Sequence, residues 1–240
     1  MRYLIAFLLI SNILIAGMTN FNTRLETRNI AVYQQEPIAS KDCAEAVQKV
    51  LKTKYSNVFI ISHDDCTSET FATLDCIVFP GGEKDVDNFD TLIKDKSRLV
   101  RNFVGAGGKY LGICMGAYIA GPMYFNILGA TSAEQYVKEA DSEITTEKET
   151  IADIYIANKP YSVYFYDGPV FKKYLRNKNI LARYKNKQAA CIIKQYKQGK
   201  VLCVGPHLES EKNWYTDKKY WHAGLHHKLL LDMVDKLFKE

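Results

Sequence analysis

Hydrophobic positions along the first half of this chain alternate between the periods of strands and helices. Short apolar runs predict strands over residues 29–33, 57–62, 76–79 and 109–113. Apolar side chains at helical spacing predict helices over residues 42–52 and 95–104, the first with Ser40 as its N-cap. This order is typical of an α/β domain of flavodoxin-like type, with a mostly parallel sheet and helices on both faces.

The second half has a different pattern, with strand-like runs separated by short turns. They predict strands over residues 150–158, 161–166, 180–184, 189–196 and 200–205. An amphipathic helix is expected over 220–238, and the charged segment 134–150 is open to either a helix or a loop. With 47% hydrophobic residues, the chain can bury one full core, so we expect a single domain over residues 28–240.

The net charge and the N-terminal segment restrict the kinds of partner expected for this protein. The formal charge of +5 comes with scattered lysines and no interleaved aromatic platform, which indicates a solvated basic face and no nucleic-acid partner. Arg2 precedes an apolar run to Met18, so residues 1–19 are predicted to be a signal peptide or an N-terminal membrane anchor. We therefore expect an exported protein, periplasmic or secreted, or one held at a membrane by this segment. The oligomeric state is left open.

The strand predicted over 109–113 enters Gly112-Ile113-Cys114-Met115-Gly116 and then a helix-forming segment. This pattern is typical of a nucleophile elbow, a strand-to-helix turn that lifts one side chain clear of the sheet, where flanking glycines avoid clashes. Cys114 is the expected nucleophile, favoured as a thiolate by the N-terminus of the following helix. The alternative is a buried cysteine with a packing role.

A thiolate nucleophile needs a base and a group that orients the base. His207 and Glu209 follow the last predicted strand and are the candidates for the base and for the group that orients it. The alternative is a histidine that only caps a strand end, beside a solvated glutamate. The N–H of Met115 and that of Gly81 or Gly82 are expected to form the oxyanion hole. An ordinary Pro-Gly-Gly turn is the alternative for the glycines.

Two further sets of residues have weaker signals. Cys43 and Cys66 are the one pair of the six cysteines considered for a disulfide. His222, His226 and His227 lack the glutamate of a zinc-protease helix, so no metal and no cofactor is expected.

The elbow together with the His-x-Glu pair and Pro80-Gly81-Gly82 resembles the class I glutamine amidotransferase superfamily. Within it, residues 107–118 and 164–171 are most similar to the amidotransferase-like N-terminal domain of biotin-protein ligases and its stand-alone bacterial form. The resemblance covers about residues 29 to 209, and Leu208 stands where the usual triad motif has proline.

The resemblance implies a Cys114-His207-Glu209 triad on a flavodoxin-like sheet. It also implies substrate contacts from Gly116, Tyr118, Tyr166 and Asp167.

No ligase catalytic domain is part of the match, and export does not suit a biosynthetic ammonia donor. We therefore expect a cysteine hydrolase that acts on an amide or peptide carbonyl of a small molecule or peptide. Two alternatives stay open. One is a non-catalytic module that binds a ligand or partner, and the other is a redox-responsive thiol.

Overall fold

The computed structural model describes residues 25–82 and 93–239. The predicted signal peptide or anchor, residues 1–19, lies outside these residues. Within the described part of the chain, no helix combines the length and the apolar character needed to cross a membrane.

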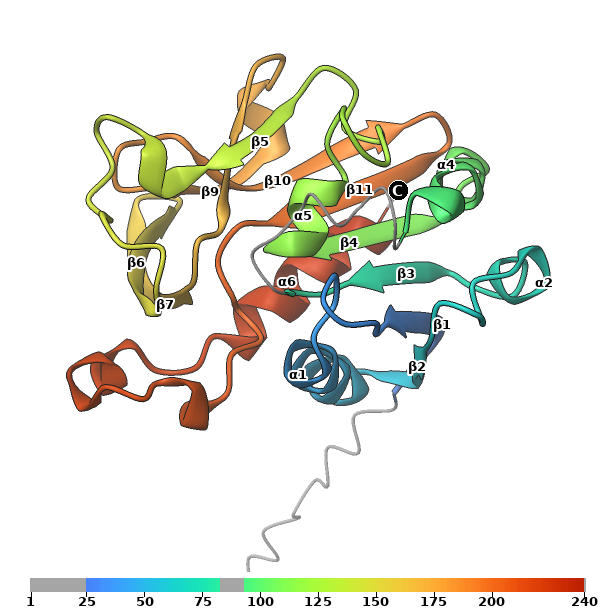
Figure 1. The fold of residues 1–240 in the computed structure, drawn as a ribbon, viewed down its shortest axis with the longest axis horizontal. Coiled ribbons are helices and arrows are strands. Elements are labelled where there is room, and N and C mark those ends of the chain that lie inside the picture. Colours follow the sequence, from blue (N-terminus) through green and yellow to red (C-terminus); the bar gives the residue numbers. More distant parts are fainter. Residues whose placement is uncertain (1–24, 83–92, 240) are drawn as a thin grey trace, which may run out of the picture.

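Five parallel strands form one half of the sheet (Figure 1). Their order is β2-β1-β3-β4-β11, and they comprise β1 (Glu26–Tyr33), β2 (Tyr55–Ile61), β3 (Cys76–Phe79), β4 (Lys109–Ile113) and β11 (Gly199–Val204). Each neighbouring pair is parallel, and β4 is central, between β3 and β11. The strands predicted from the apolar runs are confirmed, with the ends moved by a few residues.

Antiparallel strands extend the sheet beyond β11. They follow in the order β10-β9-β6-β7, while β5 and β8 pair beside β10. Their bounds are β5 (Ser132–Gln135), β6 (Thr150–Ile156), β7 (Lys159–Phe165), β8 (Pro169–Lys172), β9 (Ile180–Tyr184) and β10 (Ala189–Tyr196). The sheet is therefore mixed, with a parallel half and an antiparallel half, because the second half of the chain is joined by short turns that cannot make parallel crossovers.

Helices cover both faces of the parallel half. One face packs against α1 (Lys41–Lys52) and α6 (His227–Phe238), and the other against α2 (Ser68–Phe71), α4 (Ser97–Gly105) and α5 (Met115–Ile119). Ser40 caps α1 as expected, its side chain accepting from the N–H of Cys43. The two apolar clusters hold the helices in place, so the strand ends are fixed from both sides.

One segment differs from the expected pattern, and the sequence leaves a second one open. The last helix begins at His227, because Gly224, with φ of 73°, separates it from a 3-10 helix over Lys218–Ala223. The segment left open, residues 134–150, holds the end of β5, one 3-10 turn (Tyr136–Lys138) and loop. In the described part of the chain, the other 3-10 turns are Lys94–Lys96, Asn177–Asn179 and Lys212–Trp214.

Candidate active site

Cys114 occupies the turn between β4 and α5 with φ of 49° and ψ of −107°. A residue other than glycine is strained at this positive φ, and such strain is typical of functional turns. The flanking glycines are needed for close approach. A Cβ at Gly112 would lie 2.4 Å from the carbonyl oxygen of Gly116, and one at Gly116 would lie 1.8 Å from that of Phe79. The strand–turn–helix expected of a nucleophile elbow is present.

The register of the parallel strands brings His207 to this turn. β11 pairs with β4 so that Val204 lies opposite Ile113, and the N–H of Cys114 donates to the carbonyl oxygen of Val204 at 2.9 Å. The chain continues from this strand end to His207, whose own N–H donates to the carbonyl oxygen of Tyr164 at 2.9 Å. The imidazole is thereby held over the edge of the sheet where β4 ends.

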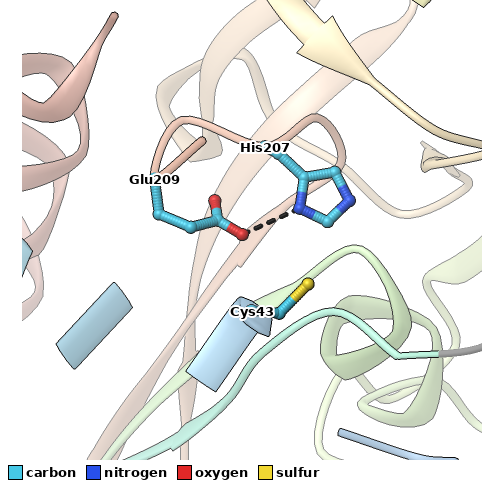
Figure 2. A group of neighbouring side chains, drawn as sticks. All are labelled: Cys43, His207 and Glu209. Atoms are coloured by element: carbon cyan, nitrogen blue, oxygen red, sulfur yellow. Dashed lines mark hydrogen bonds and ion pairs between the residues drawn. The ribbon is translucent and has the colours of Figure 1, made fainter. Parts of the chain in front are cut away.

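Figure 2 shows the Nδ1 atom of His207 facing the Glu209 carboxylate, 2.8 Å from Oε1. Both side chains are buried, with 4% of His207 and 0% of Glu209 exposed. Burial by itself lowers the pKa of His207. The negative charges of Glu209 and Cys114, together with the hydrogen bonds of the ring to both, outweigh burial and raise the pKa of His207 well above its ordinary value. The surroundings of His207 thus favour the protonated form of its imidazole.

The Cys114 sulfur has two polar neighbours. The thiol donates to the carbonyl oxygen of Tyr166 at 3.5 Å. The sulfur is also hydrogen-bonded to the His207 ring, a contact that adds to the effect of Glu209 in raising the pKa of the imidazole. Cys114, His207 and Glu209 therefore form one connected group, contributed by the ends of β4 and β11.

Gly81 and Gly82 follow β3, next to the elbow. A Cβ at Gly81 would lie 2.6 Å from Cε1 of His207 and 2.9 Å from Sγ of Cys43, and one at Gly82 would lie 2.2 Å from the carbonyl oxygen of Ile38. Met115 is the first residue of α5. Met115 thus adjoins Cys114 and Gly81 lies beside His207, while a role of these residues and of Gly82 in binding an oxyanion stays a prediction.

The expected substrate-contact residues differ in position. The Tyr118 hydroxyl donates to the carbonyl oxygen of Asp167, and the Asp167 carboxylate accepts from the side chain of Gln135. Gly116 is packed against the backbone of Phe79, whereas Tyr166 lines the cavity beside His207. A role in substrate binding stays a prediction for all four.

That cavity has a volume of about 380 Å³ and opens to solvent. Its lining includes Cys43, Tyr164, Tyr166, His207 and Trp214. A larger hollow of about 790 Å³ lies at the opposite ends of the strands, among Asp75, Lys109 and neighbouring residues, and includes none of the triad candidates. The smaller cavity therefore gives access to His207, the one triad candidate in its lining.

Cys43 and Trp214 are not among the residues that the sequence predicts for the site, whereas Tyr164 begins the segment 164–171, whose aromatic residues are expected to line a pocket or to fill the core. Cys43 lies in the first turn of α1, its sulfur directed toward the His207 ring (Figure 2). The rings of Tyr164 and Trp214 pack edge-on against His207, at 5.8 Å and 5.6 Å between centroids. The sequence offers little signal for these residues, since only the fold brings three distant segments together.

The disulfide considered between Cys43 and Cys66 is wrong. All six cysteines are free thiols. Cys66 is buried in the cluster on the other face of the sheet, among the side chains that pack against α2 and α4. Cys43 lies instead beside His207, so the two sulfurs belong to different parts of the fold.

Among known families, the model described as "Biotin-protein ligase, N terminal" matches residues 28–134. This range includes the elbow and covers a little less than half of the chain. A comparison with curated proteins gave no match.

Solved structures resemble most of the chain. PurLQS from Thermotoga maritima has 14% identity and a TM-score of 0.56, covering 88% of this chain and 99% of its own. A glutamine amidotransferase from Thermotoga maritima has 11% identity and a TM-score of 0.55, covering 87% of this chain and 84% of its own.

Exo-beta-1,4-mannosidase Op5Man5 from Opitutaceae bacterium strain TAV5 has 12% identity and a TM-score of 0.53, covering 89% of this chain and 37% of its own. At these identities the likeness concerns the fold, which occurs in chains of different activity. The resemblance to glutamine amidotransferase-like proteins and to the biotin-protein ligase N-terminal domain is confirmed.

Proposed function

Starting from an amidotransferase-like fold whose residues 28–134 match the biotin-protein ligase N-terminal family, we propose that this protein is a cysteine hydrolase. Its substrate is an amide or peptide carbonyl, Cys114 is the nucleophile, His207 the acid and base, and Glu209 orients His207. The observation that carries the proposal is the contact of two groups, Cys114 at the strained elbow and Glu209, with the His207 imidazole, which itself lines an open cavity.

In the first half of the reaction, the Cys114 thiolate attacks the carbonyl carbon and a C–S bond forms. The carbonyl electron pair moves to oxygen, where backbone N–H groups stabilise the negative charge. In the first turn of α5, the amides of Gly116, Ala117 and Tyr118 already donate to the carbonyl oxygens of Pro80 and Cys114. The Met115 N–H is thus the first-turn donor suited to this role, with Gly81 or Gly82 as the second.

His207 then gives its proton to the leaving nitrogen, the C–N bond breaks, and a thioester on Cys114 remains. In the second half, water attacks the thioester while His207 takes one proton from that water. The C–S bond breaks and the carboxylic acid leaves. One amide and one water are converted into one acid and one amine, and the enzyme returns to its starting state.

The cavity favours a substrate with an apolar or aromatic group next to the carbonyl. Tyr164, Tyr166 and Trp214 form its apolar walls, and Asp42 and Glu149 lie at its polar side. Glu149 already accepts from the backbone and the hydroxyl of Thr216. Asp42, at the start of α1, is the acidic group best placed for a polar or positively charged group of the substrate.

The test is labelling of the full chain by iodoacetamide and by a panel of electrophilic amide analogues, with mass spectrometry identifying the modified cysteine. Near neutral pH, Cys114 is expected to react first, and the His207→Asn variant is expected to slow this reaction at least about tenfold. The Cys66→Ser variant, altered far from the site, is the matched control and should react like the unchanged protein.

Uniformly slow labelling of all cysteines would refute the proposed nucleophile and favour the non-catalytic binding module. Labelling of Cys114 that does not depend on His207 would refute the assigned base. Reversible oxidation confined to Cys114, without turnover of any amide in the panel, would favour a redox-responsive thiol instead.

A further inference from the structure

A second thiol lies on the Glu209 side of the imidazole. The sulfur of Cys43, a ring nitrogen of His207 and a carboxylate oxygen of Glu209 all lie within 4.8 Å of one another. Figure 2 shows the three side chains converging from two segments, the start of α1 and the loop after β11. The proposed hydrolysis assigns no role to Cys43, so this convergence needs a separate explanation.

The Glu209 carboxylate has an unused oxygen. Oε1 accepts from Nδ1 of His207, whereas Oε2 is buried and finds no hydrogen-bond partner among the described residues. An unsatisfied buried carboxylate oxygen is costly, and a hydrogen-bond donor or a bound cation would compensate it. The carboxylate belongs to a side chain that is 0% exposed, so this oxygen is not compensated by bulk water.

We propose that Cys43, His207 and Glu209 form a binding site for a thiophilic divalent cation of the Zn²⁺ class. One sulfur, one imidazole nitrogen and one carboxylate oxygen are a donor set that Zn²⁺ prefers, whereas Mg²⁺ and Ca²⁺ require oxygen ligands. Donors around a tetrahedral Zn²⁺ are separated by about 3–4 Å, so the three groups need only a small contraction to bind one ion.

The charges also favour a divalent ion. On binding, the Cys43 thiol and Nδ1 of His207 each release a proton to solvent. The thiolate and the carboxylate then carry two negative charges, which the two positive charges of the ion cancel beside a neutral imidazole. A buried site without net charge avoids the desolvation cost that an uncompensated ion would incur.

The site has a consequence for the proposed function, and this consequence rests on that function. With the ion on Nδ1, the remaining ring proton is on Nε2, so the imidazole has no free nitrogen to accept a proton from Cys114 or from water. The ion also displaces the hydrogen bond between His207 and Glu209. Bound Zn²⁺ is therefore an inhibitor that switches off the Cys114 chemistry.

Metal binding is measured on the full chain, freed of metal with a chelator, by titrating Zn²⁺ against a chromogenic competitor. One ion per chain is expected, and the Cys43→Ser variant should weaken the affinity at least about tenfold. The Cys66→Ser variant is the matched control because it removes a buried thiol outside the cluster. Equal affinity of the Cys43→Ser variant and the unchanged protein would overturn the site.

A cobalt titration provides a second readout that does not depend on activity. Co²⁺ in this site should give the near-ultraviolet charge-transfer absorption of a thiolate ligand, absent in the Cys43→Ser variant and retained in the Cys114→Ser variant. Loss of the band in the Cys114→Ser variant alone would refute Cys43 as the ligand. The spectrum of the unchanged protein is informative even if a variant fails to fold, since absence of the band there also refutes the proposal.

Metal binding and hydrolysis can fail separately. Zn²⁺ binding that is lost with Cys43 supports the metal site even if no amide is hydrolysed. Zn²⁺ should also slow iodoacetamide labelling of Cys114 in the unchanged protein, whereas Mg²⁺ should not. If bound Zn²⁺ leaves the Cys114 labelling rate unchanged, the inhibitory consequence is wrong.

Discussion

Replacing Gly116 by alanine places a methyl group where the fold has no space. The added Cβ would lie 1.8 Å from the carbonyl oxygen of Phe79, whereas real Cβ contacts essentially never fall below 3.0 Å. The neighbouring atoms are backbone of the central sheet, so α5 has to move away from β3 by about 1.2 Å. That movement takes Cys114, the residue before α5, away from His207.

The expected cost is about 3 kcal/mol of stability, because backbone cannot relax around an overpacked methyl group. For a domain of this size, this corresponds to a melting temperature lower by roughly 6–12 °C. A displacement of about 1 Å is also expected to slow Cys114 labelling by iodoacetamide about a hundredfold. Thermal denaturation followed by circular dichroism and the labelling rate at neutral pH measure the two effects.

Gly121→Ala is the matched control, since its Cβ would lie 2.9 Å from one atom, the carbonyl oxygen of Tyr118. A shift of about 0.1 Å relieves that contact, so this variant should lose less than about 1 kcal/mol and label normally. If Gly116→Ala melts and labels like Gly121→Ala, the elbow does not depend on close packing against β3, and the steric reasoning is refuted.

Three other perturbations test the surroundings of the site. Tyr110→Phe removes the buried hydroxyl that donates to the Gly116 carbonyl oxygen at 2.6 Å. It should cost about 1–3 kcal/mol in urea denaturation, and an unchanged midpoint would contradict this role. Leu208→Ala empties a fully buried position between His207 and Glu209. It should cost about 2–5 kcal/mol and slow Cys114 labelling, whereas full stability would show that the leucine packs loosely. Burial raises the pKa of the Cys66 and Cys191 thiols to about 12, so both stay protonated and unlabelled between about pH 6 and 9. Their labelling in the folded protein in that range, measured by mass spectrometry, would contradict the burial.

Local sequence determined the elbow, the N-cap of α1 and most strand positions. The turn at Cys114 depends on residues that are neighbours in the chain, since glycines on both sides allow the backbone to approach α5 and β3. The approximate positions of the strands follow from apolar runs, whose pattern is itself local. The fold class could therefore be predicted, together with Cys114, His207 and Glu209 as candidates.

Tertiary structure decided which of these residues meet and what surrounds them. His207 reaches Cys114 because β11 pairs in parallel with β4, a choice of neighbour that no local pattern encodes. The antiparallel half of the sheet and the place of Cys43 beside His207 arise in the same way, from contacts between segments distant in the chain. Local sequence propensity determines where helices and strands form, whereas the burial of both faces of the sheet determines the order in which the strands pair. That selection alone brought a second thiol and an unsatisfied carboxylate oxygen to the same imidazole.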